Sequence, residues 1–144
     1  MSSKRMTRLV RRAERCPYCF QKTELVSNEE IYGKVYGAGK AYLCRPCNAY
    51  VGTHADGRPF GSLANEELRL WRNVAHSYFD AMWQERVAHG KPRHWARTEA
   101  YRWLRKQMHK SPDITHIGMF TIEECQQVVA LCRQKVPTLI PNPL

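Results

Sequence analysis

The chain has 144 residues, of which 43% are hydrophobic, and it carries a formal net charge of +10. This length allows one compact domain, or a small metal-stapled module beside a helical one, and it excludes two large independent cores. No run of about 18 apolar residues is present, which excludes a membrane-spanning helix. The basic N-terminus is not followed by the apolar stretch of a secretory signal. We therefore expect a cytoplasmic protein with no membrane partner.

The excess positive charge is concentrated in two segments. Residues 1–15 contain six Lys or Arg and one acidic residue, and residues 91–110 contain seven against one. This distribution is typical of a polyanion-binding surface, although a soluble basic protein with a disordered tail would share it. We interpret 1–15 as a basic flexible tail and predict the following nucleic-acid-binding residues: Arg5, Arg8, Arg11, Arg12, Arg93, Arg97, Arg102, Arg105 and Lys106.

Residues 16–57 carry the short-strand and turn signals of a small β module. Four β-prone stretches occur, at residues 25–26, 31–32, 35–36 and 41–43. Glycines at positions 33, 37 and 39 separate the later ones. Gly37-Ala38-Gly39 predicts the turn of a hairpin that leads into Cys44.

Two Cys-x-x-Cys pairs flank this β module, and they comprise Cys16, Cys19, Cys44 and Cys47. Two short knuckles can bring paired thiolates around one ion in tetrahedral geometry, and four thiolates leave no open position for a substrate water. The alternative is a redox-active dithiol, but such a pair is expected at the start of a helix in a βαβ context. The spacing therefore predicts one structural Zn²⁺ with these four ligands, in a module too small to fold without it.

Helical periodicity begins after a turn-rich connector and continues over residues 62–136. Three helices are predicted, from Asn65 to about His89, from Thr98 to about His109, and from Thr121 to about Gln134. Thr121 and Glu124 have the spacing of a capping box. Residues 137–144 form a Pro-rich extended tail. The predicted fold class is α+β: a small N-terminal four-cysteine, zinc-ribbon-like β module, followed by a three-helix module packed against it.

The two remaining cysteines are seven residues apart in the last predicted helix. Cys125 and Cys132 align with an apolar stripe, and free cysteine is commonly buried as a small hydrophobe. We predict core packing, with a second metal site that includes His116 as the less favoured alternative. Most of the four tryptophans should also be core residues.

Several polar residues could serve catalysis. His76 and Asp80 are four apart on the first predicted helix, so the carboxylate could orient the imidazole as a general base of a nuclease-like site. An ordinary ion pair or buried hydrogen bond is the commoner reason for this spacing. His54, seven residues beyond Cys47, could hydrogen-bond a thiolate or cap the zinc module.

Motifs spread from residue 16 to about 132 carry a family resemblance. They include Cys16-Pro17-Tyr18-Cys19, Cys44-x-x-Cys47 with residues 49–54, the segment 61–80, Ala100-Tyr101-x-Trp103-Leu104 and residues 116–120. With these motifs the chain resembles a family of zinc-finger-containing proteins from bacteria and bacteriophages. The resemblance implies zinc ligands and gives no activity. It places five side chains within family motifs, as a candidate polar site: His54, Arg72, His76, Asp80 and His116. Phe20 departs from the family pattern, in which glycine usually follows the first knuckle.

These observations predict a zinc-stabilised nucleic-acid-binding protein, with DNA or RNA as its partner. It would contact phosphates through the basic tail and the basic helix. One alternative is a phage-encoded modifier or inhibitor that binds a host protein through the same charged surface. The other is a nuclease that uses His76, Asp80 and His116.

Overall fold

The structure is a computed structural model that describes residues 2–144. Its contacts divide the chain into an N-terminal unit that ends at Glu67 and a helical unit that begins at Leu68. Together they contain a three-stranded antiparallel sheet and helices, which is the predicted α+β class. None of the helices in the described residues has the length and apolarity needed to cross a bilayer.

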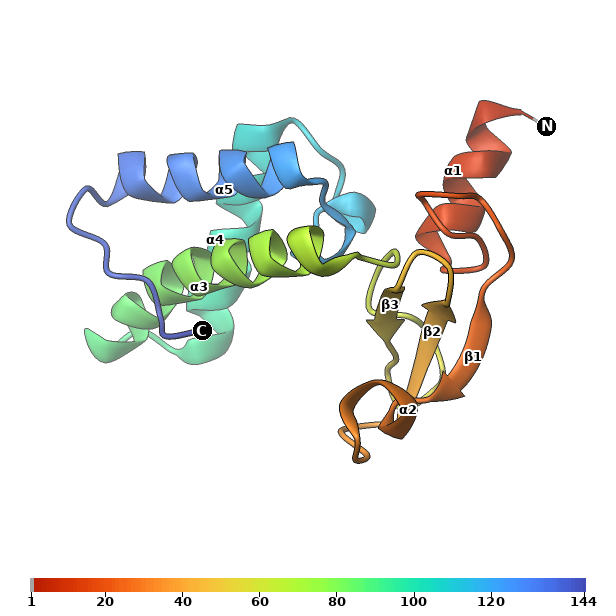
Figure 1. The fold of residues 1–144 in the computed structure, drawn as a ribbon. Coiled ribbons are helices and arrows are strands. Elements are labelled where there is room, and N and C mark those ends of the chain that lie inside the picture. The colour runs from red at the N-terminus through yellow and green to blue at the C-terminus, as the bar shows by residue number, and fades with distance from the viewer. Residues whose placement is uncertain (1) are drawn as a thin grey trace. The chain divides into compact units, whose positions relative to one another are not determined.

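The N-terminal unit is built on a sheet with strand order β1 (Glu24–Ser27), β2 (Lys40–Cys44) and β3 (Ala49–Gly52), which Figure 1 shows. Leu25 pairs with Tyr42 in the first ladder, and Cys44 pairs with Ala49 in the second. Two further bridges, Tyr50 to Ala64 and Thr53 to Pro59, tie residues 59–64 back to the end of the sheet. The unit therefore continues beyond residue 57, the predicted end of the β module.

Helix α1 (Ser3–Arg11) lies in the segment for which the charge pattern predicted a flexible tail. The Ser2 hydroxyl caps it by accepting from the Arg5 N–H at 3.2 Å. Met6, Leu9 and Val10 fall on one side of this helix, an i, i+3, i+4 spacing that identifies an amphipathic helix. The chain after α1 packs into the N-terminal unit, because the side chain of Ala13 is fully buried.

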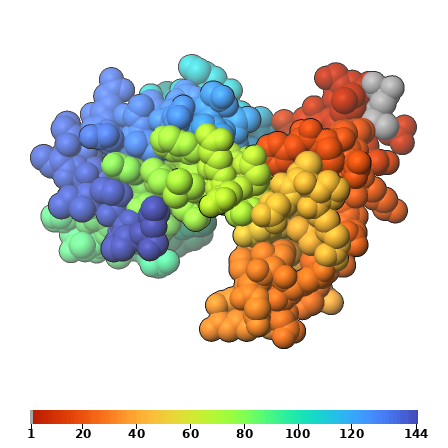
Figure 2. Space-filling model, viewed as in Figure 1, coloured from red at the N-terminus to blue at the C-terminus, as the bar shows by residue number. Residues whose placement is uncertain are grey.

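Helix α2 (Glu29–Tyr32) replaces one of the predicted strands, and residues 35–36 are also not a strand. The side chain of Asn28 closes the loop: its Nδ2 donates to the Tyr36 carbonyl at 2.7 Å, and its Oδ1 accepts from the Tyr36 N–H at 3.2 Å. The backbone at Gly39 has a φ of 82°, so a glycine suits the turn into β2. Figure 2 shows α2 and its loop, in orange, at the opposite end of the N-terminal unit from the red α1.

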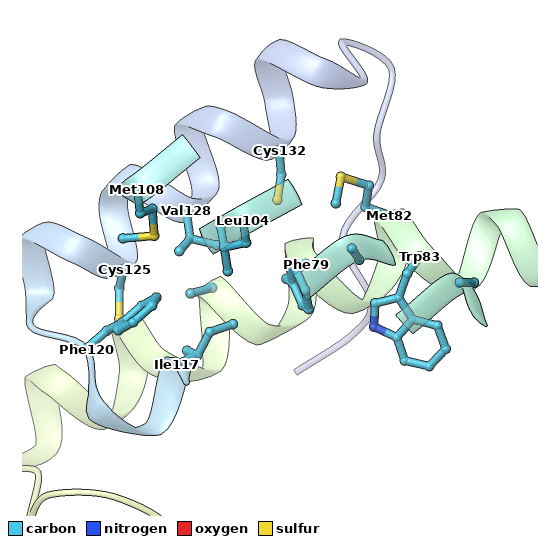
Figure 3. Packing of buried hydrophobic residues seen from close by; sticks show 13 residues of the cluster. Phe79, Met82, Trp83, Leu104, Met108, Ile117, Phe120, Cys125, Val128 and Cys132 are labelled. Atoms are coloured by element: carbon cyan, nitrogen blue, oxygen red, sulfur yellow. The ribbon is translucent and has the colours of Figure 1, made fainter. Parts of the chain in front are cut away.

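The helical unit contains α3 (Glu66–Ala88), α4 (Arg93–Met108) and α5 (Ile122–Lys135), with short 3₁₀ helices at Pro112–Ile114 and Ile117–Met119. Figure 3 shows its core. The labelled side chains come from all three helices and from the segment before α5: Phe79, Met82, Trp83, Leu104, Met108, Ile117, Phe120, Cys125, Val128 and Cys132. Core packing of Cys125 and Cys132 is thereby confirmed, since both are fully buried.

The helix boundaries follow local signals with one exception. The capping box at the start of α5 is confirmed, since the Thr121 hydroxyl accepts from the Glu124 N–H and the Glu124 carboxylate accepts from the Thr121 N–H. Helix α4 begins at Arg93, five residues before the predicted start at Thr98. Pro92 precedes it with extended dihedrals, which suits proline next to a helix start.

The Pro-rich tail, residues 137–144, has no regular secondary structure. It is attached to α3 by Asn142, whose N–H donates to the Ser77 carbonyl at 3.2 Å and whose Nδ2 donates to Gln84 at 2.8 Å. Asn142 also accepts a hydrogen bond from the Ser77 hydroxyl through its carbonyl. The extended tail is thus part of the helical unit.

Candidate metal centre

The first knuckle is a tight turn that carries Cys16 and Cys19. A bridge between Arg15 and Lys22 forms its base, and the Cys16 N–H donates to the Gln21 carbonyl at 2.9 Å. The turn is closed by the Phe20 N–H, which donates to the Cys16 carbonyl at 2.8 Å. The Tyr18 N–H points at the Cys16 sulfur, 3.4 Å away. Backbone geometry therefore presents both sulfurs toward the same side of the turn.

The second knuckle joins β2 to β3. Cys44 is the last residue of β2 and pairs with Ala49, the first residue of β3, so Cys47 lies in the turn between them. The Asn48 N–H donates to the Arg45 carbonyl at 3.2 Å. Arg45 makes ion pairs with Glu24 and Glu30 outside the turn. Neither Cys pair stands at the start of a helix, which is where a redox dithiol is expected.

The two knuckles bring the four sulfur atoms together. All four lie within 4.8 Å of one another, and the Sγ atoms of Cys19 and Cys44 are 3.6 Å apart. A tetrahedral zinc with bonds of about 2.3 Å needs sulfur atoms about 3.8 Å apart. The donor set and its spacing fit one zinc ion, and with all four positions filled by thiolates the ion is structural.

The electrostatics of the cluster also call for a cation. A hydrogen bond from the Gln21 N–H lowers the pKa of Cys19. Hydrogen bonding to Cys19 raises the pKa of Cys47 to about 12, and burial raises the pKa of Cys44. Four thiolates at these distances repel one another unless a cation neutralises them. Zinc supplies that charge and displaces the thiol protons when it binds.

The hydrophobic core around the cluster is small. The buried hydrophobic residues that surround it are Ala13, Cys16, Cys44, Ala49 and Leu63. Two of these five are zinc ligands, and Leu63 is the single large aliphatic side chain among them. The metal therefore takes the place of a hydrophobic core in this unit.

A left-handed residue follows each knuckle. Phe20 has a φ of 60° and Asn48 has a φ of 48°. Glycine adopts such a φ without steric cost, whereas phenylalanine does so rarely. The Phe20 ring lies 5.5 Å from the Arg15 guanidinium, a cation–π contact that glycine could not make.

The fold and the sulfur cluster define a protein with a four-cysteine zinc-binding β module and a helical unit. A family model described as a zinc-finger-containing domain matches residues 12–135, and the chain belongs to this family. A comparison with curated proteins found no match, and a comparison with solved structures found none either.

The residues of the candidate polar site are not all in one unit. His54 lies in the N-terminal unit, where its ring makes an edge contact with Phe60 at 4.4 Å. In the helical unit, the Asp80 carboxylate accepts from the Trp83 Nε1 at 2.9 Å, and Nδ1 of His76 is 3.0 Å from the Arg72 carbonyl oxygen. These contacts are of the ordinary structural kind and do not require a catalytic role.

Arg72 and His116 occupy distinct surroundings. Arg72 is buried, and its Nε donates to the Phe120 carbonyl at 3.1 Å, which joins α3 to the segment before α5. His116 is exposed, with its ring 6.4 Å from that of Tyr101. Burial raises the pKa of Tyr101.

The basic residues of α1 share one face of the helix. Lys4, Arg8 and Arg11 are at i, i+4 and i+7, and Arg5 and the C-cap residue Arg12 lie beside them. At about 100° per residue, these five side chains occupy about a third of the circumference. The first turn contains no acidic residue, and all five basic residues are exposed. The helical spacing of the basic residues was visible in the sequence, yet Lys4 was not among the predicted residues.

The basic residues of α4 divide into two groups. Arg93 stacks over Trp83 at 4.9 Å, and Arg97 stacks over Tyr101 at 5.0 Å. Arg102 and Lys106 are four residues apart on the exposed side, where Arg102 forms an ion pair with Glu99 at 2.8 Å. Arg105 is half-buried. The predicted α4 residues therefore do not form one continuous face.

Proposed function

We propose that this zinc-finger-containing protein binds nucleic acid, DNA or RNA, with the zinc as a structural support. The observation that carries the proposal is the basic face of α1, which groups Lys4, Arg5, Arg8, Arg11 and Arg12 on an exposed helix whose first turn contains no acidic residue. A cluster of exposed cations on one side of a helix is the electrostatic footprint expected of a phosphate-binding surface. Arg102 and Lys106 on α4 supply further phosphate contacts.

The zinc centre supports this role indirectly. Residues 13–23 attach α1 to the metal site, since Ala13 is buried beside Cys16 and the Thr23 hydroxyl donates to the Ala13 carbonyl. A helix of nine residues is marginal when isolated in water. Anchoring at Ala13 gives the basic face a fixed base from which to contact phosphates.

The salt dependence of binding tests the proposal quantitatively. Each phosphate contact releases counterions and contributes about −0.9 to the slope of log K against log salt on duplex DNA, and about −0.7 on single strands. Five contacts from α1 therefore predict a slope of about −4. A protein that binds through hydrogen bonds to bases alone would show a much shallower slope.

The experiment is fluorescence anisotropy of labelled DNA and RNA with the zinc-loaded protein across a salt series. Replacing Arg8 and Arg12 with glutamine should weaken binding and make the slope shallower by about 1.5, since two contacts are lost. Glutamine keeps the helix propensity of arginine. The matched control replaces Lys34 and Arg133, two exposed cations that do not belong to α1, with glutamine and should leave the slope unchanged.

Three results would oppose the proposal. Equal losses in the α1 variant and the control would mean that net charge, and not the basic face, governs binding. Negligible binding at physiological salt would remove the nucleic-acid function and favour the protein-binding alternative, for which an acidic surface of a host protein is the partner to seek. A shortened probe on a denaturing gel would favour the nuclease.

A further inference from the structure

The N-terminal unit has a groove between the end of α1 and the sheet. Its volume is about 640 Å³, and it is lined by Arg11 and Arg12 of α1, by Leu25 and Tyr42 of the sheet, and by His54 and residues 56–59 of the following loop. A second concave surface, of about 480 Å³, runs along α1 and also includes Arg11 and Arg12. The two surfaces therefore adjoin at Arg11 and Arg12, where the basic face of α1 borders the groove.

The charges in the groove favour an anion. Arg11, Arg12 and Arg58 face one acidic residue, Asp56. The Arg58 Nε donates to the Asp56 carboxylate at 2.6 Å, and the Arg58 N–H donates to the other carboxylate oxygen at 3.0 Å. The backbone hydrogen bond from Arg58 lowers the pKa of Asp56, so the pair is ionised and its charges offset. Arg11 and Arg12 then leave the groove with a net positive charge.

The floor of the groove is apolar. Leu25 and Tyr42 are directly paired across β1 and β2, so their side chains share one face of the sheet. Leu25 is 55% exposed, which is high for a leucine in a sheet. The Tyr42 hydroxyl donates to the Gly57 carbonyl at 3.2 Å and holds the ring in place. An aromatic ring and an aliphatic side chain beside arginines are the elements on which nucleobases stack.

We propose that this groove binds a single-stranded segment of nucleic acid. One base would stack on Leu25 and Tyr42, while Arg11 and Arg12 contact the flanking phosphates and the strand continues along α1. A duplex cannot use this floor, because its bases are already stacked on one another. The inference rests on the proposed function and adds to it the class of nucleic acid that is preferred.

The test compares a labelled single strand of about ten nucleotides with the duplex of the same sequence, at one salt concentration. We expect tighter binding to the single strand. Leu25→Ser should lower single-strand affinity about fivefold and leave duplex affinity unchanged. Tyr42→Leu should do the same, whereas Tyr42→Phe, which keeps the ring, should stay close to the unmodified protein. Val35→Ser is the matched control, since Val35 is 58% exposed in the same unit and lies outside the groove.

Zinc content of each variant shows that the fold is retained. Equal affinity for the single strand and the duplex, with Leu25→Ser indistinguishable from Val35→Ser, would overturn the groove while the salt-dependent binding through α1 stands. Tighter binding to the duplex would also overturn it. No binding to either probe would overturn the groove and the proposed function together.

Discussion

Removing one zinc ligand should unfold the N-terminal unit and leave the helical unit folded. Five buried hydrophobic residues surround the sulfur cluster, against thirteen in the core of the helical unit. Leu63 is the one large aliphatic side chain among these five residues, and its burial contributes about 2 kcal/mol. Ordering the backbone costs about 1 kcal/mol or more for each residue. Structural zinc binding contributes about 10 kcal/mol or more, so the unit depends on the metal.

Two variants with the same chemical change test this dependence. Cys47→Ser removes a ligand, and Cys132→Ser changes a fully buried core residue of α5. The first should lose zinc, whereas the second should keep zinc and lose about 1–3 kcal/mol of helical-unit stability, because a hydroxyl is buried without its water partners.

The positions of the tryptophans allow the stability of the two units to be measured separately. All four tryptophans, at positions 71, 83, 95 and 103, lie in the helical unit. Tryptophan fluorescence in urea therefore reports the stability of that unit, and hydrogen exchange of β2 and β3 reports the N-terminal unit. In Cys47→Ser we expect rapid exchange in both strands with an unchanged tryptophan transition. Retained protection of β2 and β3 in a zinc-free protein would refute the reasoning.

Three further outcomes are expected. Thr121→Ala removes half of the capping box with Glu124 and should lower the stability of the helical unit by about 1 kcal/mol. Urea unfolding followed by tryptophan fluorescence measures this change, and an unchanged unfolding midpoint would contradict the capping role. A chelator should make the four cysteines of the metal site reactive toward a thiol label detected by mass spectrometry. Cys125 and Cys132 should stay unreactive at neutral pH, since burial raises their pKa values to about 11 and about 12. Fast labelling of either one would mean that the core opens. Asn48→Ala should weaken zinc binding about fivefold in a competition titration, since alanine disfavours a φ of 48°, whereas Asn48→Gly should not.

The zinc site could be predicted from the sequence because its information is local. Cys16 with Cys19, and Cys44 with Cys47, each have a spacing that only a tight turn and a shared ion satisfy well. The capping box at Thr121 is local in the same sense. The left-handed conformations of Phe20 and Asn48 were not predicted, because phenylalanine does not signal a positive φ, and asparagine signals it more weakly than glycine does.

Two predictions differ from the structure, one made from strand propensity and one made from charge. Ile31 and Tyr32 are β-prone residues, yet they belong to α2, because Asn28 closes a loop that no strand could make. The N-terminal segment was expected to be a flexible tail on account of its charge, although its apolar residues had helical spacing. Tertiary hydrogen bonds and periodicity outweigh single-residue preference in both cases.

The tryptophans show a further limit of the sequence. Trp83 is buried, Trp71 and Trp103 are half-buried against the core, and Trp95 is 40% exposed. Three of the four tryptophans therefore lie in the core or pack against it, as predicted. The Arg86 guanidinium lies 4.7 Å above the Trp95 ring and covers it from one side. A large amphipathic ring can be satisfied by a cation as well as by apolar packing.

The proposed role is tested most directly by hydrogen exchange of the zinc-loaded protein with and without a saturating single-stranded oligonucleotide. The account predicts slower exchange in α1 and in residues 54–59, with little change at α2, which lies at the other end of the N-terminal unit. Protection confined to the helical unit, or none at all under conditions where binding is measured, would contradict the account.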